Sequence, residues 1–197
     1  GKIAEFKPDI VHVHWIGAGF ITPEHLADIN LPIVWTLHDL WPLCGAEHLP
    51  GSKRFIEGYL KNNRPPGESW LDLDRYEWDR KIKVFKDTNI TFVAPSHYVY
   101  ELAKKTKAIE NHKLVYIPNG IDKGIFHETS ASFTSKKIVL FVANNPKLDL
   151  NKGFADFLEA IRLLPKELKE SIEIKIVGGE VVSEQEMVNI YGGASIT

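Results

Sequence analysis

Polar and aromatic side chains follow the candidate strands of this sequence, at positions where they could bind a ligand. The first apolar run is followed by His14 and Trp15, and the second by His38, Asp39 and Trp41. Ligands of open parallel sheets bind outside the carboxyl ends of the strands. The recurring imidazoles therefore predict a binding or catalytic site along one sheet edge. The other strand ends carry Ser96, Asn119, Gly120, Asn144, Asn145, Gly178 and Gly179.

Lys152 indicates a site for an anion. Asn151 is expected to cap a helix over residues 154–164, which would leave Lys152 in the first helical turn beside Gly153. A cation at that position opposes the helix dipole by about 0.3–1 kcal/mol, and a bound phosphate would reverse the sign of this effect. The pattern also fits a surface lysine whose long stem carries its charge into solvent, and both interpretations stay open.

His12 and His14 lie two residues apart, so both imidazoles are expected on the same face of a strand. With His38 and Asp39 at the next strand end, they leave a zinc site, and hence a metal-dependent hydrolase, as an alternative. The spacing is unspecific, because no cysteine cluster and no HExxH helix accompany it. A strand histidine is also more often packed and hydrogen-bonded than bound to metal. We therefore expect no metal.

Other aromatic and basic residues are expected to have structural roles. Trp78, Ile82 and Phe85 recur at helical spacing, which predicts packing rather than sugar binding. Two basic stretches are expected on solvated helix faces, with a peripheral membrane contact as a minor alternative. Their lysines are Lys81, Lys83, Lys86, Lys104, Lys105, Lys107 and Lys113.

Six short apolar runs alternate with helical patterns, which predicts a doubly wound α/β fold with parallel sheets. The expected strands are residues 10–14, 33–37, 91–95, 114–117, 137–142 and 172–177. Ser96 and Ser183 are expected to cap helices. A polar insert over residues 50–69 is long for a compact unit, which is typical of a functional or mobile loop.

The composition excludes several classes of protein. The chain has 197 residues, of which 44% are hydrophobic and 25% charged, as in ordinary globular domains. A formal net charge of −2 lacks the basic excess of a nucleic-acid-binding protein. No apolar run approaches the ~18 residues of a membrane span. The single cysteine, Cys44, and the lack of a secretory signal indicate a cytoplasmic location.

Several stretches, taken in series, resemble the group 1 (family 4) retaining glycosyltransferases, whose GT-B fold has two Rossmann-like domains. The likeness is closest to members that build bacterial surface polysaccharides, such as the colanic-acid-type transferases. It covers nearly the whole chain in the order of the family. The matching stretches are PDIVHVHW at 8–15, PIVWTLHDLW at 32–41, LDRYEWDRK at 73–81, FVAPS at 92–96, VYIPNGID at 115–122 and NKGF at 151–154.

The resemblance implies that a hexosyl group moves from a nucleotide-diphosphate sugar to the hydroxyl of a sugar or lipid-linked glycan, with retention of configuration. It also implies no cofactor and no metal, and a location in the cytoplasm or at the cytoplasmic face of the membrane. His38 would contact the donor sugar. The donor phosphates would be bound by Lys152, Gly153, Asn144 and Asn145. The acceptor side of a cleft that closes around the donor would include His14, Trp15, Asp39, Trp41, Ser96, Asn119 and Gly120.

The sequence departs from the family pattern at three places. Asn144 and Asn145 stand where many members have an arginine, while the family's glycine-rich loop and its pair of glutamates are expected before Gly1 and after Thr197. We therefore expect an internal piece, inactive alone, with residues 1–130 from the acceptor-side domain and 131–197 from the nucleotide-sugar domain. A Ser/Thr-rich linker is expected at 129–135. A non-catalytic binding module of the same fold is the alternative.

Overall fold

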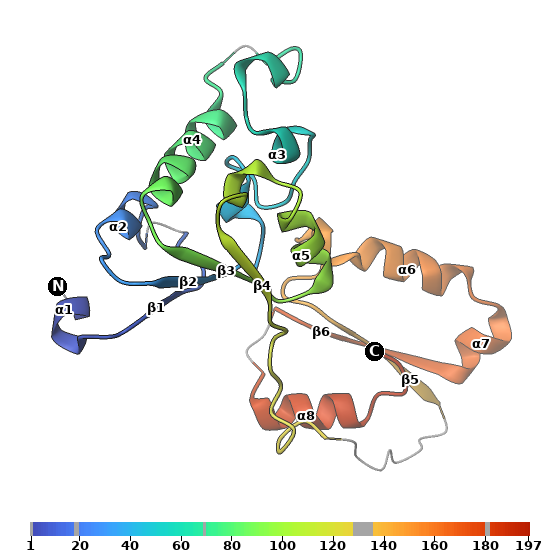
Figure 1. The fold of residues 1–197 in the computed structure, drawn as a ribbon. Helices are drawn as coiled ribbons and strands as arrows, with labels where there is room; N and C mark the ends of the chain where they lie inside the picture. Colours follow the sequence, from blue (N-terminus) through green and yellow to red (C-terminus); the bar gives the residue numbers. More distant parts are fainter. Residues whose placement is uncertain (1, 18–19, 69, 128–135, 180–181) are drawn as a thin grey trace. The chain divides into compact units, whose positions relative to one another are not determined.

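The computed structural model describes residues 2–17, 20–68, 70–127, 136–179 and 182–197. The chain divides into two compact units, residues 1–120 and 121–197. Each unit contains a parallel sheet with helices beside it (Figure 1), which confirms the predicted α/β class with parallel sheets. The linker expected at 129–135 lies outside the described residues.

Unit 1 is built on a four-stranded parallel sheet in the order β1-β2-β3-β4. The predicted strands are confirmed to within one residue at each end. Their bounds are β1 (Val11–Val13), β2 (Ile33–Thr36), β3 (Ile90–Ala94) and β4 (Lys113–Tyr116). The register pairs Val13 with Trp35, Trp35 with Phe92, and Phe92 with Leu114. Because side chains alternate between faces, this register puts the four side chains in one row on one face.

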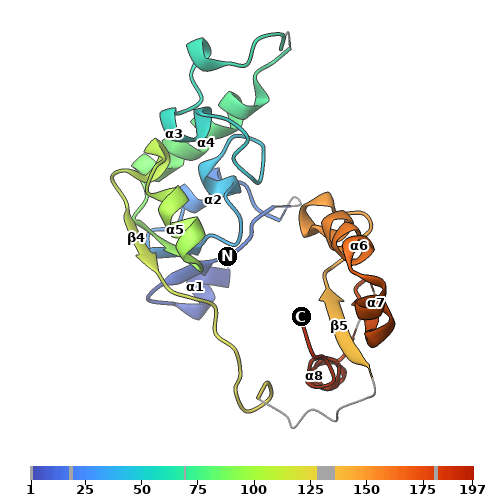
Figure 2. The same ribbon diagram turned by 90° about the vertical axis from the view of Figure 1, so that its right-hand side faces the viewer.

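Two helices of unit 1 begin at a residue whose side chain caps the first turn. Ser96 accepts a hydrogen bond from the backbone N–H of Val99, as predicted, and Asp72 accepts one from Arg75. Figure 2 shows α5 beside β4. The helices are α1 (Lys2–Phe6), α2 (Glu24–Ala27), α3 (Arg54–Glu57), α4 (Leu73–Lys86) and α5 (His97–Ala103), with 3₁₀ turns η1 (Trp41–Leu43), η2 (Lys61–Asn63) and η3 (Lys107–Ile109).

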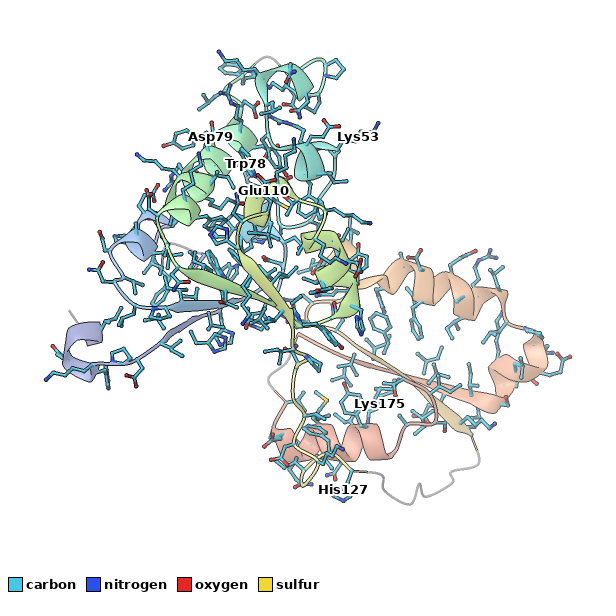
Figure 3. All side chains as sticks on the ribbon, viewed as in Figure 1. Lys53, Trp78, Asp79, Glu110, His127 and Lys175 are labelled. Carbon is cyan, nitrogen blue, oxygen red and sulfur yellow. The ribbon has the colours of Figure 1, made fainter. Side chains whose placement is uncertain are left out.

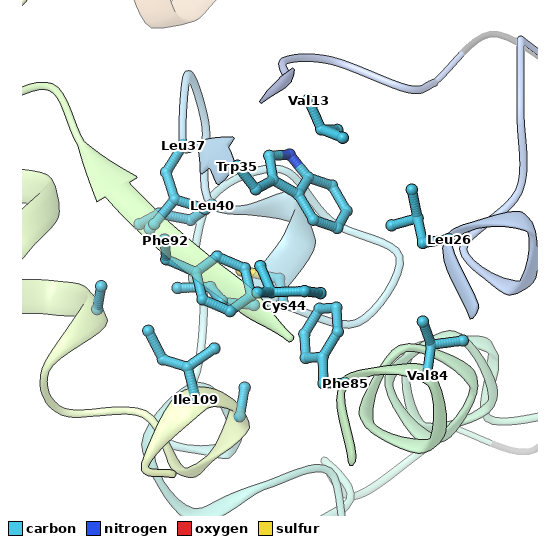
Figure 4. Packing of buried hydrophobic residues seen from close by; sticks show 14 of the residues in the cluster. Val13, Leu26, Trp35, Leu37, Leu40, Cys44, Val84, Phe85, Phe92 and Ile109 are labelled. Carbon is cyan, nitrogen blue, oxygen red and sulfur yellow. The ribbon is translucent and has the colours of Figure 1, made fainter. Parts of the chain in front are cut away.

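The hydrophobic core of unit 1 lies between the sheet and helices α2 and α4 (Figure 4). Trp35 is 1% exposed, and its ring centroid lies 6.1 Å from that of Phe85 and 6.1 Å from that of Phe92. Phe85 and Phe92 meet edge to face at 5.3 Å. Leu26 of α2 is also completely buried. Aromatic rings from two strands and one helix therefore fix how α4 sits on the sheet.

The polar insert at 50–69 is organised around one buried guanidinium. Arg54 is 2% exposed and donates to both carboxylate oxygens of Asp72, at 3.2 and 2.6 Å. It also donates to Asn63 Oδ1 at 3.2 Å. Burial favours the neutral acid of Asp72, but the bonds from Arg54 and from the Arg75 N–H outweigh it and hold the pKa of this carboxyl below its usual range. The insert is therefore folded against α4 rather than extended.

Unit 2 contains a two-stranded parallel sheet of β5 (Lys137–Val142) and β6 (Ile172–Val177), both with their predicted bounds. Figures 1 and 2 show α6 and α7 on one side of this sheet and α8 on the other. The other elements are η4 (Leu150–Lys152), α6 (Phe154–Leu163), α7 (Lys166–Ser171) and α8 (Glu184–Gly192). Ser183 and Glu186 form the predicted capping box. No helix in the described parts of the chain is long and apolar enough to cross a bilayer.

Replacing Trp35 by alanine tests the core. We expect Trp35→Ala to lower the free energy of unfolding of unit 1 by about 3–5 kcal/mol, because it leaves a cavity among packed rings. The measurement is urea denaturation followed by circular dichroism. Trp70, which is 87% exposed, is the matched control, and Trp70→Ala is expected to change stability by less than about 0.5 kcal/mol. Equal effects of the two changes would contradict the assigned core.

Candidate functional site

Four polar side chains line one face of β1 and β2 at their carboxyl ends. His12 is paired with Val34 in the register, so the alternation that exposes His12 also brings His14, Thr36 and His38 to the same face. His12 Nε2 lies 2.9 Å from Thr36 Oγ1, and His14 Nδ1 lies 2.8 Å from His38 Nε2. The predicted imidazoles are thus brought together, and His38 Nδ1 has no partner among the described residues.

The surroundings of His12 favour its neutral ring. Desolvation, together with the neighbouring rings of His14 and His38, lowers the pKa of His12. The nitrogens that His14 and His38 turn toward each other are also used in their mutual hydrogen bond. Within the described residues, no group of three or more His, Cys, Asp or Glu side chains could hold a metal ion. The arrangement therefore gives no support to the zinc alternative.

The loop after β2 brings the predicted Asp39 and Trp41 next to this cluster. Asp39 accepts a hydrogen bond from the Trp41 backbone N–H at 3.0 Å, and its other oxygen lies 2.6 Å from His48 Nδ1. His14, Trp15, His38, Asp39 and Trp41 all line one small pocket. Its volume of about 10 Å³ would hold at most one water. A larger ligand would therefore lie over these side chains, on the open surface.

Lys81 binds this loop from the interior of unit 1. The prediction that Lys81 is solvated is therefore wrong. Its side chain is completely buried, and the ammonium donates to the carbonyl oxygens of Trp41 at 2.5 Å and Gly45 at 2.6 Å. The same nitrogen lies 4.3 Å from the centre of the Trp41 ring, a cation–π distance. Burial lowers the pKa of Lys81 to about 8, and this effect outweighs the nearby carboxylates of Glu77, Glu47 and Asp39, which raise it.

Cys44, Glu47 and Tyr59 form a connected cluster that reaches the amine of Lys81 through Cys44 and Glu47. Burial raises the pKa of the Cys44 thiol to about 12, and it also raises the pKa of Glu47 and of Tyr59. The Tyr59 hydroxyl donates to Glu47 Oε1, while Glu47 Oε2 is buried without a partner among the described residues. The loop that carries Asp39 and Trp41 is therefore anchored in a polar cluster inside unit 1.

Three other predicted residues of unit 1 do not join the histidine cluster. The hydroxyl of Ser96 is used as the cap of α5. Asn119 and Gly120 follow β4 and are exposed. None of the three lines the pocket beside His14 and His38. These three residues follow strands of the same sheet as the cluster, at its carboxyl edge, but they lie outside the cluster.

In unit 2, the predicted phosphate-binding residues lie in one loop, between β5 and α6. Asn144 and Asn145 are exposed, and Asn145 has a left-handed backbone with φ of 48°. Lys152 Nζ lies 3.7 Å from Asp149 Oδ2, and its side chain is 43% exposed. A surface ion pair of this kind contributes little and leaves the ammonium free to bind an anion.

The predicted cap of α6 is wrong by two residues. The helix begins at Phe154 with Gly153 as its cap, and Gly153 has a left-handed φ of 68°. Lys152 instead ends the 3₁₀ turn η4, whose cap is Asp149. The left-handed glycine turns the chain between the two helical segments, so Lys152 precedes the first turn of α6. The argument from the helix dipole therefore no longer applies to its ammonium.

The strand ends of unit 2 approach each other closely at Gly178. A Cβ atom at this glycine would lie 1.8 Å from the carbonyl oxygen of Ala143, so no larger residue fits. The end of β6 opens onto a pocket of about 500 Å³, whose walls include Gly178 and, on α8, Glu186 and Asn189. None of Asn144, Asn145, Lys152 and Gly153 lines this pocket.

Sequence reasoning missed Lys81, Arg54 and His48. A signal for Lys81 was present, because it lies three residues after Trp78 and four before Phe85, within the apolar stripe of α4. A lysine inside such a stripe faces the core and needs buried acceptors. For Arg54 and His48 no local pattern exists, since their carboxylate partners, Asp72 and Asp39, are reached only through the tertiary fold.

The lowered pKa of Lys81 gives a prediction of pH dependence. Between about pH 8 and the usual lysine pKa of 10.5, the unfolded chain holds a proton that the folded chain releases, so this residue makes stability rise with pH. We expect the stability of the wild type relative to Lys81→Met to increase by about 3 kcal/mol across this window. The measurement is urea denaturation at several pH values.

Lys83→Met is the matched control, because Lys83 is exposed on the same helix. Its stability is expected to follow that of the wild type at each pH. A constant difference between the wild type and Lys81→Met over this range would contradict the assigned burial of the amine.

Comparison with known proteins places the chain in a family. The sequence model of Glycosyltransferase Family 4 matches residues 1–124, which include the sheet of unit 1, the histidine cluster and the loop anchored by Lys81. No curated protein matches the chain. The match covers more than half of the 197 residues, and the chain therefore belongs to Glycosyltransferase Family 4.

Proposed function

We propose that this chain belongs to a retaining glycosyltransferase that uses a nucleotide-diphosphate sugar. The single observation that carries the proposal is the family match over residues 1–124, which spans the exposed histidine cluster. In the reaction, the acceptor oxygen bonds to the anomeric carbon while the bond from that carbon to the diphosphate breaks. The acceptor proton is released, and negative charge develops on the leaving diphosphate.

His38 is proposed to contact the donor sugar near the reacting carbon. One of its nitrogens is fixed by His14, and the other is free to hydrogen-bond a ligand. A ring oriented in this way loses little freedom when the ligand binds. Trp15 and Trp41, which share the pocket with His38, would offer apolar surface to a sugar ring. Asp39 is proposed to contribute by holding the loop after β2 in place, since both of its carboxylate oxygens are already hydrogen-bonded, to the Trp41 N–H and to His48.

Lys152 is proposed to neutralise the donor phosphates, with Gly153, Asn144 and Asn145 beside it. A fixed cation near a leaving group stabilises the charge that develops in the transition state. The side-chain amides of the two asparagines can donate to phosphate oxygens but carry no charge. The negative charge of the donor phosphates is therefore neutralised less strongly here than by the arginine found in many members of the family.

The proposal also covers the domain architecture, the acceptor, the pathway and the location. The architecture is two Rossmann-like domains of GT-B type, the acceptor is a sugar or lipid-linked glycan, and the pathway is surface polysaccharide synthesis of the colanic-acid type. The proposal further includes a cytoplasmic location with peripheral membrane contact, and transfer without a metal. The resemblance of the quoted motifs supports them.

Binding of the nucleotide tests the role of Lys152. We expect calorimetric titration with UDP- and GDP-sugars to detect binding of one of them, and Lys152→Ala to weaken it about tenfold or more, as for a charge-assisted bond. Lys166→Ala is the control, because Lys166 is 83% exposed and lies in α7. Unchanged affinity in Lys152→Ala would contradict the phosphate assignment.

Turnover tests the role of His38 and distinguishes an enzyme from a binding module. In the protein that carries this chain, His38→Ala is expected to lower kcat by about 100-fold or more, as for loss of a group that acts in the transition state. His25→Ala, which changes a histidine outside the cluster, is expected to leave kcat unchanged. Transfer that survives a chelator would support metal independence. Donor binding without any transfer in the wild type would favour the non-catalytic alternative.

A further inference from the structure

Strand β6 of unit 2 has one edge that is open to another strand. Its inner edge pairs with β5 along all six residues of the strand. The far edge of β5 is also used, because residues 195 and 196 form backbone hydrogen bonds with Ile138 and Leu140. The outer edge of β6 forms no backbone hydrogen bond within the described parts of the chain. Such a row of free N–H and C=O groups is a template for a further strand.

The sequence of β6 leaves this edge suited to pairing. The strand reads IEIKIV, with four β-branched apolar residues, no proline and no glycine. Residues 173–176 are exposed, and the side chains of Ile174 and Ile176 retain 39% and 43% of their exposure. Natural edge strands are often blocked by proline, a bulge or charged side chains. β6 pairs with β5 without a bulge, and its two charges have opposite signs.

The two charged side chains of β6, Glu173 and Lys175, lie on one face of the sheet. The register with β5 places Lys175 beside Leu140, on the face opposite that of Phe141. Phe141 packs against α6, so both charges lie on the side that carries α8, where Figure 3 labels Lys175. Neither charge forms an ion pair or a hydrogen bond within the described residues. Both are therefore available to charges on a partner strand.

A second copy of β6, running antiparallel, matches these side chains in one register. Opposite residues of an antiparallel pair lie on the same face and contact each other. With Ile174 opposite Ile174 of the second copy, each Glu173 lies opposite a Lys175. Each Ile172 then lies opposite an Ile176. A shift by two residues would place Glu173 opposite Glu173 or Lys175 opposite Lys175, and like charges in this position destabilise a sheet. A shift by one residue would place isoleucines opposite charges.

We propose that two copies of this protein associate through the outer edges of β6, as an antiparallel pair centred on Ile174 and joined by two pairs of Glu173 with Lys175. The contact has two-fold symmetry, so it uses the free edge of both strands and closes the assembly at two copies. The isoleucines of the two strands would form one apolar row beside Phe141. A pair of six-residue strands is a small interface, so we expect a reversible dimer. The proposal does not depend on nucleotide-sugar transfer.

Sedimentation velocity with charge reversals tests this proposal, using the protein that carries this chain at micromolar to submillimolar concentrations. We expect the wild type to dimerise reversibly. Glu173→Lys puts lysine opposite lysine at both pairs, and Lys175→Glu puts glutamate opposite glutamate. Each change is therefore expected to weaken dimerisation about tenfold or more. Lys147→Glu is the matched control, because Lys147 is exposed in the same unit but lies outside β6, and it is expected to leave dimerisation unchanged.

Restoring the complementary charges distinguishes loss of this contact from loss of folding. The double variant Glu173→Lys/Lys175→Glu exchanges the two signs and is expected to dimerise as the wild type does. The two single variants are expected to form a mixed dimer when combined, because one carries only lysines and the other only glutamates at these positions. A wild type that stays monomeric at every concentration would overturn the proposal. So would single variants that dimerise as tightly as the wild type, or a failure of either the double variant or the mixture to recover dimers.

Discussion

Parallel pairing of β1 with β2 is the constraint on which both the core and the candidate site depend. The register that joins Val13 to Trp35 on the core face also brings His12, His14 and His38 together on the other face. A slip of β1 by one residue would exchange its two faces, turning His12 and His14 toward the core and Val13 away from it. The pattern of apolar residues that stabilises unit 1 therefore also specifies where its histidines lie.

The loop after β2 is held from inside rather than by surface contacts. An ammonium group without water is unfavourable unless several acceptors surround it, and Lys81 has two backbone carbonyls and the face of Trp41. The carbonyls belong to loop residues 41 and 45, so the loop has to keep its shape for the charge to be tolerated. Burial of one charge thereby fixes the backbone that carries Asp39 and Trp41.

Sequence reasoning predicted the elements well and the polar contacts poorly. Strand bounds follow from apolar runs that the sequence displays directly, and the caps at Ser96 and Ser183 involve neighbours within three residues. The sequence predicted that His14 and His38 lie at one sheet edge, but it did not predict the hydrogen bond between them. The prediction of the α6 cap was wrong because a left-handed Gly153 separates two helical segments. The buried contacts of Arg54 and Lys81 were not predicted because their partners lie 18 residues away in the sequence for Arg54, and 36 and 40 residues away for Lys81.

The environment of Cys44 gives this protein a built-in reporter of local opening. It is the single cysteine of the sequence, its thiol is completely buried beside Lys81, and its raised pKa keeps it protonated. Only the thiolate attacks alkylating reagents, so modification has to wait until the surrounding loop detaches. The rate of alkylation under native conditions consequently measures how often this loop leaves the body of unit 1, without global unfolding.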